Sequence, residues 1–193
     1  LSQVCIPSIY QDELGAVWLG TTEGLNRYNG KDVKVFQPSE SNHGLTNNEI
    51  NELCGDKNGR MYIRSGNDLI KLDIYTEQFT CLRQKGVYGL FCKKDTLWVS
   101  CADGIYYYTG QGTELTFFAR VQKGFVGRAL YVDKETVWVV TRKYLVAISR
   151  EDPLRQEILL TLDKGNCILG DSSGNIWVGA WNGLYRISPN RET

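Results

Sequence analysis

The residues that could carry catalysis or hold a metal are one histidine and six cysteines, and their spacing favours neither role. The histidine, His43, lies in the polar stretch SESNHGLTNN, which is typical of a surface loop. The cysteines stand 49, 27, 11, 9 and 66 residues apart, with no CxxC pair and no zinc-type spacing. Most lie in apolar stretches, so we interpret them as small core residues and predict no metal and no cofactor. Disulfides remain open for an exported chain, with no pairing indicated.

Enzymatic chemistry has little support in the sequence. The chain has no GxSxG, HExxH, P-loop or GxGxxG motif. Its acidic residues are scattered, and no local pair has a spacing that indicates a glycosidase, although a fold can bring two distant carboxylates together. We therefore predict a non-enzymatic domain and keep a lyase or hydrolase as a minor alternative.

Binding chemistry is better represented, at turns between short apolar segments. Sugars present both C–H patches and hydroxyl groups, so aromatic faces beside planar polar groups suit them. Trp181 is the strongest candidate, because the matching turns of other units carry Thr22 and Ala102 and so do not need a tryptophan. The guanidinium groups of Arg64 and Arg142 suit carboxylate or sulfate groups. The alternatives are that Trp181 packs on a neighbouring loop and that the arginines form surface salt bridges.

The candidate set extends to other polar residues of these turns and of the links between units. The predicted ligand-binding residues are Trp181, Asn182, Arg64, Asn67, Asp103, Arg142, Lys143 and His43. Other polar or aromatic residues of the links are Asn47, Asn48, Tyr88 and Arg128.

The elements that must position these side chains form an internal repeat. An aromatic residue recurs at Trp18, Tyr62, Trp98, Trp138 and Trp177, at intervals of 44, 36, 40 and 39 residues. An apolar or aromatic residue follows each of them ten positions later, so each copy is a rigid unit and the variation lies in the links. We interpret the repeated aromatics as core, because neighbouring units bury both faces of each copy.

Each copy has the pattern of a four-stranded antiparallel meander. Short segments rich in Val, Ile and aromatic residues alternate with turns such as DELG, DKNG and DSSG, in which Asp opens the turn and Gly accepts a positive φ. About five units of roughly 40 residues predict an all-β fold, a β-propeller of four-stranded blades. The predicted blades span approximately residues 4–40, 48–83, 87–120, 127–162 and 166–193, in a single domain over 1–193. An irregular β-sandwich is the alternative.

Composition excludes several classes of protein. The 22 Lys and Arg residues balance 22 Asp and Glu residues, and no basic stripe stands out, so we predict no binding to nucleic acid. No apolar run approaches the roughly 18 residues of a membrane span. The first residues lack the pattern of a signal peptide, which leaves both a cytosolic protein and a mature exported domain open.

Three stretches are more specific than a generic propeller pattern. Residues 8–36, SIYQDELGAVWLGTTEGLNRYNGKDVKVF, closely resemble the two-component regulator propeller repeat. GLTNNEINEL (44–53) resembles the link between blades in that family, and GNIWVGAWNGLYRI (174–187) is another close match. The second to fourth units are degenerate, and the fourth has Lys143-Tyr144 where Gly-Leu is typical. The resemblance covers nearly the whole chain.

The resemblance implies a role as well as a fold. Members of this family have seven-bladed propellers in the periplasmic sensors of Bacteroidetes hybrid two-component systems, which bind oligosaccharides and signal as dimers to a histidine kinase and a transcriptional regulator. On this basis we expect a truncated fragment with about five of the seven blades, held at the membrane only through downstream segments. The rival hypothesis is a propeller that serves only as a scaffold for dimerisation or protein docking.

An incomplete propeller would leave two blade faces uncovered. Such faces carry apolar side chains and open strand edges, both of which drive association. We therefore expect either a tightened five-bladed ring or, in preference, association of copies through the open ends.

Overall fold

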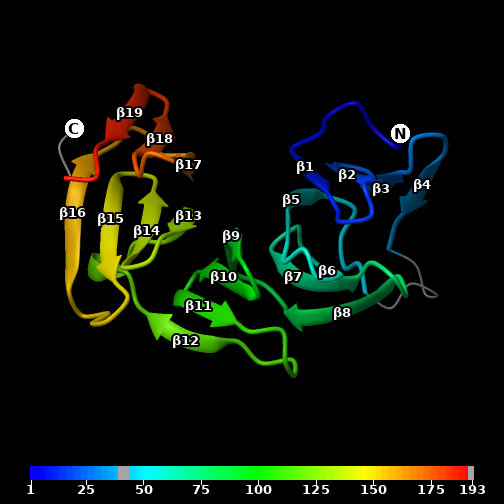
Figure 1. Cartoon of the computed structure of the whole chain (residues 1–193), viewed down its shortest axis with the longest axis horizontal. Helices are drawn as coiled ribbons and strands as arrows, with labels where there is room; N and C mark the ends of the chain where they lie inside the picture. The colour runs from blue at the N-terminus through cyan, green and yellow to red at the C-terminus, as the bar shows by residue number, and fades with distance from the viewer. Residues whose placement is uncertain (39–43, 191–193) are drawn as a thin grey trace.

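The computed structural model describes residues 1–38 and 44–190, and its regular elements are β-strands apart from one 3-10 turn, Gln122–Gly124. The prediction of an all-β fold is confirmed. The strands form five antiparallel sheets, which we call blades 1 to 5 (Figure 1). Among the described residues, no helix is long and apolar enough to cross a bilayer.

The first four blades have four strands each, and the described part of the fifth has three. Blade 1 contains β1 (Ser8–Gln11), β2 (Val17–Thr21), β3 (Gly24–Tyr28) and β4 (Val33–Phe36). Blade 2 contains β5 (Ile50–Gly55), β6 (Arg60–Ser65), β7 (Asp68–Asp73) and β8 (Gln78–Arg83). Blade 3 contains β9 (Val87–Lys93), β10 (Thr96–Cys101), β11 (Gly104–Tyr108) and β12 (Thr116–Ala119). Blade 4 contains β13 (Gly127–Val132), β14 (Thr136–Thr141), β15 (Tyr144–Ser149) and β16 (Gln156–Thr161). Blade 5 contains β17 (Cys167–Gly170), β18 (Ile176–Ala180) and β19 (Gly183–Ile187).

The blades are arranged in an open arc. Each is a simple meander, and the first strands of successive blades contact one another in the order β1, β5, β9, β13, β17. Blades 1 and 5 form two separate arms in Figure 1, with the chain ends on opposite sides of the gap. The expectation of a tightened five-bladed ring is therefore wrong, because successive blades turn too little for five of them to close.

An aspartate ties the first turn of a blade to the aromatic residue of its second strand. Oδ1 of Asp12 accepts the backbone N–H groups of Leu14 at 3.0 Å and Ala16 at 2.9 Å. Its other oxygen, Oδ2, accepts the indole N–H of Trp18 at 2.7 Å. The carboxylate–indole bond recurs in blades 4 and 5, as Asp133–Trp138 at 2.6 Å and Asp171–Trp177 at 2.9 Å. The predicted turn role of the aspartate is confirmed, and the same group also orients the aromatic ring.

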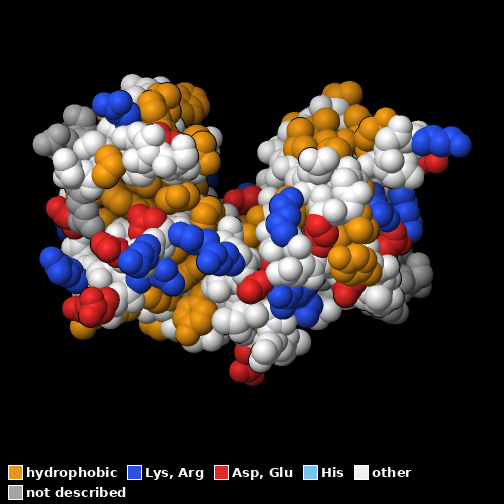
Figure 2. Space-filling model, viewed as in Figure 1, with side chains coloured by type: hydrophobic (Ala, Val, Ile, Leu, Met, Phe, Trp, Pro, Cys, Tyr) orange, Lys and Arg blue, Asp and Glu red, His pale blue; other side chains and the backbone are white. Residues whose placement is uncertain are grey.

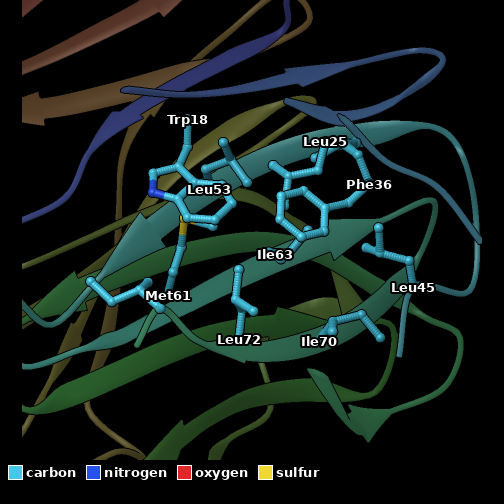
Figure 3. Close-up of a cluster of buried hydrophobic side chains, with 11 residues drawn as sticks. Trp18, Leu25, Phe36, Leu45, Leu53, Met61, Ile63, Ile70 and Leu72 are labelled. Atoms are coloured by element: carbon cyan, nitrogen blue, oxygen red, sulfur yellow. The ribbon is translucent and has the colours of Figure 1, made fainter. Parts of the chain in front are cut away.

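The core lies between blades, and the repeated aromatic residue of each blade faces the next one. Figure 3 shows Trp18 of β2 against Leu53 and Met61 of blade 2, in a cluster that spans the first two blades. Trp18 and Tyr62 are fully buried, and Trp98 and Trp138 are 5% exposed. Trp177 is only half-buried. The prediction of a core residue at that position is thus met in part, because no described blade follows blade 5.

Candidate ligand-binding surface

A hollow of about 600 Å³ lies at the centre of the arc, and residues from all five blades line it. Figure 2 shows the molecule hollowed between the arm that ends in blade 5 and the arm that begins with blade 1. The polar lining comes largely from the first strands of blades 2 to 4, from β6, and from the turn between β6 and β7. Its polar and aromatic lining residues include Glu52, Arg64, Asn67, Tyr88 and Arg128.

Glu52 and Arg64 face each other in this hollow. They are register partners on β5 and β6, and Arg64 Nε donates to Glu52 Oε2 at 3.4 Å. The same oxygen accepts the backbone N–H of Leu90 from β9 at 3.1 Å. Burial raises the pKa of the Glu52 carboxyl to about 7, although Arg64 and the Leu90 N–H oppose the shift. The upward direction of this shift means that Glu52 accepts a proton more readily than an ordinary glutamate, and a proton on this carboxyl removes the charge that faces Arg64.

A second hollow of about 420 Å³ adjoins the first, because Tyr88 and Arg128 line both. Its other walls include Phe125, which follows the 3-10 turn, and Arg142 and Lys143 from the turn between β14 and β15. Arg128, Arg142 and Lys143 are exposed, and none makes an ion pair with any residue in 1–38 or 44–190. Uncompensated cations thus stand beside two aromatic side chains.

The two hollows together suit an acidic, ring-bearing ligand. Their lining contains four basic residues and a single carboxylate, that of Glu52. Guanidinium groups bind carboxylate and sulfate through paired hydrogen bonds, and aromatic faces pack against the C–H side of a sugar ring. Of the predicted site residues, the structure brings Arg64, Asn67, Arg142 and Lys143 to this one surface.

Asp103 lies beside this surface but its carboxylate is already engaged. It borders a smaller hollow that shares Gly124 and Phe125 with the second. Its Oδ1 accepts from Arg83 at 2.8 Å, and its Oδ2 accepts the hydroxyl of Tyr106 at 2.9 Å. Desolvation acts to raise the pKa of this carboxyl, but the two hydrogen bonds outweigh it and the net shift is downward. Asp103 therefore links β8 of blade 2, through Arg83, to β11 of blade 3, through Tyr106.

Trp181 and Asn182 stand apart from both hollows, on the turn between β18 and β19. The Trp181 ring is 76% exposed and carries the Lys164 ammonium 3.6 Å from its centroid. Asn182 accepts the backbone N–H of Asp163 at 3.2 Å and donates to the Tyr185 hydroxyl at 2.6 Å. An exposed indole of this kind adds nothing to the core. The role of Trp181 as a surface on which a sugar ring packs stays a prediction. His43 lies outside the described residues.

Glu52 and Phe125 line this surface but were not among the sequence candidates. Glu52 is the one charged residue in β5 (INELCG), the first strand of blade 2, and a charge on a first strand is a signal that could have found it. Phe125 follows Lys123 and Gly124, both with positive φ, a turn that carries the ring into the second hollow. Among the described residues, no three His, Cys, Asp or Glu side chains are grouped as metal ligands would be.

Comparison with known proteins identifies the fold. The sequence matches no protein-family model and no curated protein. The extracellular domain of BT3049 from B. thetaiotaomicron, assigned to the hybrid two-component systems, superposes with a TM-score of 0.86 at 23% identity, over 100% of this chain and 30% of that one. The extracellular domain of BT4673 from the same organism, assigned to the one-component systems, gives 0.79 at 20% identity, over 98% and 30%.

A third solved structure, a streptogramin B lyase, gives a TM-score of 0.75 at 17% identity, over 100% of this chain and 68% of that one. These similarities establish a propeller-like fold. This chain spans less than a third of the length of the two extracellular domains.

Proposed function

We propose that this chain is part of the periplasmic sensing domain of a hybrid two-component system and that it binds an oligosaccharide bearing acidic groups. The observation that carries the proposal is the pair of adjoining hollows, where unpaired Arg128, Arg142 and Lys143 stand beside Tyr88 and Phe125. The superposition on extracellular domains of B. thetaiotaomicron supports the location and the sensory class. In this proposal the chain is a binding module, and the histidine kinase and transcriptional regulator belong to a longer protein.

We expect saturable binding of oligosaccharides that carry uronate or sulfate, measured by calorimetric titration with acidic and neutral oligosaccharides of matched length. Arg128→Ala and Arg142→Ala should each weaken binding by about tenfold, because each removes a charge-assisted hydrogen bond. Added salt should weaken it further. Arg155→Ala is the matched control, since Arg155 is exposed in the turn at the opposite end of β15. Tighter binding of the neutral set, or an equal loss in the control, would refute the acidic-ligand proposal.

The same titration tests the predicted role of Trp181. Trp181→Ala removes an exposed ring, so the unfolding free energy should change little while any stacking contribution to binding disappears. A loss of affinity with this variant would extend the ligand site across blade 5. Unchanged affinity would restrict the site to the two hollows.

A second candidate function, association of copies, is favoured by the outer faces of the end blades. Ile9, Leu19 and Val35 share one face of blade 1 by register, and Ile9 is 63% exposed. The outward face of blade 5 carries Leu169 at 64% and Leu184 at 69% exposure, beside half-buried Trp177. Apolar faces of this kind favour self-association.

We expect this chain to form dimers or larger assemblies in light scattering, and Leu184→Lys to shift the distribution toward monomer. Leu154→Lys is the control, because Leu154 is 92% exposed in the turn between β15 and β16, away from either end face. A monomer at all concentrations for the unmodified chain would exclude association through the ends.

A further inference from the structure

We infer that Cys54 and Cys92 form a disulfide that joins blade 2 to blade 3. Cys54 lies on β5 and Cys92 on β9, the neighbouring first strands of the two blades. Their Sγ atoms are 2.8 Å apart. This separation is about 0.75 Å longer than the bonded S–S distance of about 2.05 Å. Both side chains are half-buried against one apolar cluster, which includes Tyr62 and Leu90.

This pair is distinct from the other cysteines of the chain. Cys5 and Cys167 are exposed, Cys101 is buried, and Cys81 is half-buried on β8. No second Sγ–Sγ contact occurs among the described residues, all of whose cysteines carry free thiols in this structure. No third metal-ligating side chain joins Cys54 and Cys92 in the part of the chain described, so the arrangement fits a covalent bond better than a metal.

The environment gives the two thiols different parts in the reaction. Burial, followed by the contact with Cys92, raises the pKa of the Cys54 thiol well above its usual range. The attacking species in thiol–disulfide exchange is a thiolate, so this shift makes Cys54 poorly suited to the first attack, and we assign that step to its neighbour Cys92. With a disulfide oxidant such as oxidised glutathione, the Cys92 thiolate bonds to one oxidant sulfur and expels the other as a thiolate. Cys54 then gives its proton to solvent, attacks Cys92 Sγ and expels the second thiolate, so two thiols are oxidised and one disulfide is reduced.

The bond would fix the blades where the ligand surface is built. Glu52 and Cys54 are two residues apart on β5, and Leu90 and Cys92 are two residues apart on β9, so each pair lies on one face of its strand. The hydrogen bond from Leu90 N–H to Glu52 already links the same two strands inside the hollow. A covalent link across 38 residues of sequence adds a constraint that no sheet hydrogen bond supplies, since β5 and β9 belong to different sheets. The bond depends only on this geometry, whether or not the chain senses a ligand.

Peptide mapping of the unmodified chain tests the inference. The chain is equilibrated with oxidised glutathione, its free thiols are alkylated, and it is digested with trypsin without reduction. Cleavage places Cys54 in peptide 35–57 and Cys92 in peptide 86–93, each with one cysteine. We expect a species with the summed mass of the two peptides less two hydrogens, which reduction converts to the separate peptides. Alkylation of both cysteines in the oxidised sample, or linkage of either to another cysteine, overturns the inference.

Thermal unfolding supplies a second readout. The oxidised chain should melt about 10 °C above the reduced chain, because the bond closes a long loop in the unfolded state. Cys92→Ser should abolish the difference between the two conditions, whereas Cys81→Ser, a half-buried thiol without a thiol neighbour, should preserve it. Equal melting temperatures for the oxidised and reduced unmodified chain would count against a bond at this position.

Discussion

Replacing Trp18 with alanine lowers the free energy of unfolding by about 3–5 kcal/mol. The indole is fully buried and stacks on Phe36 with ring centroids 5.7 Å apart. It also contacts the side chains that blade 2 sends toward blade 1, among them Leu53 and Met61 (Figure 3). Truncation therefore leaves a cavity in the layer that joins the two blades, and the surrounding strands can fill it only partly.

Trp177→Ala is the matched control for this prediction. Trp177 occupies the same position of the repeat and keeps the same bond to an aspartate, but it is half-buried because no described blade packs on it. Its removal should cost less than half as much as that of Trp18. Urea unfolding followed by circular dichroism measures both losses. Equal losses would mean that something covers the outer face of blade 5 in solution, and the end-face association proposed above would be the first explanation to examine.

The period of the sequence was sufficient to predict the strands and their order. Aromatic residues at intervals near 40, with turn residues before and after each, are local features that reflect packing inside one blade. The structure follows them even in the degenerate fourth unit, where β14 and β15 pair across a turn of Arg142 and Lys143 without the usual glycine. The hydroxyl of Thr141 stabilises that turn by accepting the backbone N–H of Tyr144 at 2.9 Å, as Thr21 does in the matching turn of blade 1 by accepting the backbone N–H of Glu23 at 3.1 Å.

The features that depend on how blades are placed relative to one another were beyond the sequence pattern. Trp177 matches the repeat as well as Trp18 does, and nothing within its own unit records whether a further blade covers it. The proximity of Cys54 to Cys92 follows from the contact of β5 with β9, which a spacing of 38 residues does not reveal. The sequence pattern drew attention to Tyr88 and Arg128 as residues of the links between blades, but their place in a wall shared by the two hollows follows from the packing of the blades.

Asp12→Ala should lower the free energy of unfolding by about 3 kcal/mol, although the three hydrogen bonds that its carboxylate accepts all come from blade 1. Asp12 is 4% exposed, and its two oxygens accept three hydrogen bonds, from Leu14, Ala16 and the Trp18 indole. Alanine leaves these donors without a partner in a site that water reaches poorly, and each buried unpaired donor costs about 1–3 kcal/mol. The expected total loss is smaller than the sum of the three separate costs, because the turn can relax toward solvent.

Asp12→Asn separates the two functions of this carboxylate. Asparagine keeps Oδ1 for the backbone N–H groups of the turn but places an NH₂ group opposite the indole N–H, so only the bond to Trp18 is lost. We expect Asp12→Asn to lower the free energy of unfolding by about 1–2 kcal/mol, which places its stability between that of the unmodified chain and that of Asp12→Ala. Asp152→Ala is the control, because Asp152 caps an exposed turn through Leu154 N–H at 3.1 Å and holds no aromatic ring. If the asparagine variant is as stable as the unmodified chain, the bonds to the turn N–H groups account for the whole contribution of Asp12 to stability. The bond from Asp12 to the Trp18 indole then contributes nothing measurable.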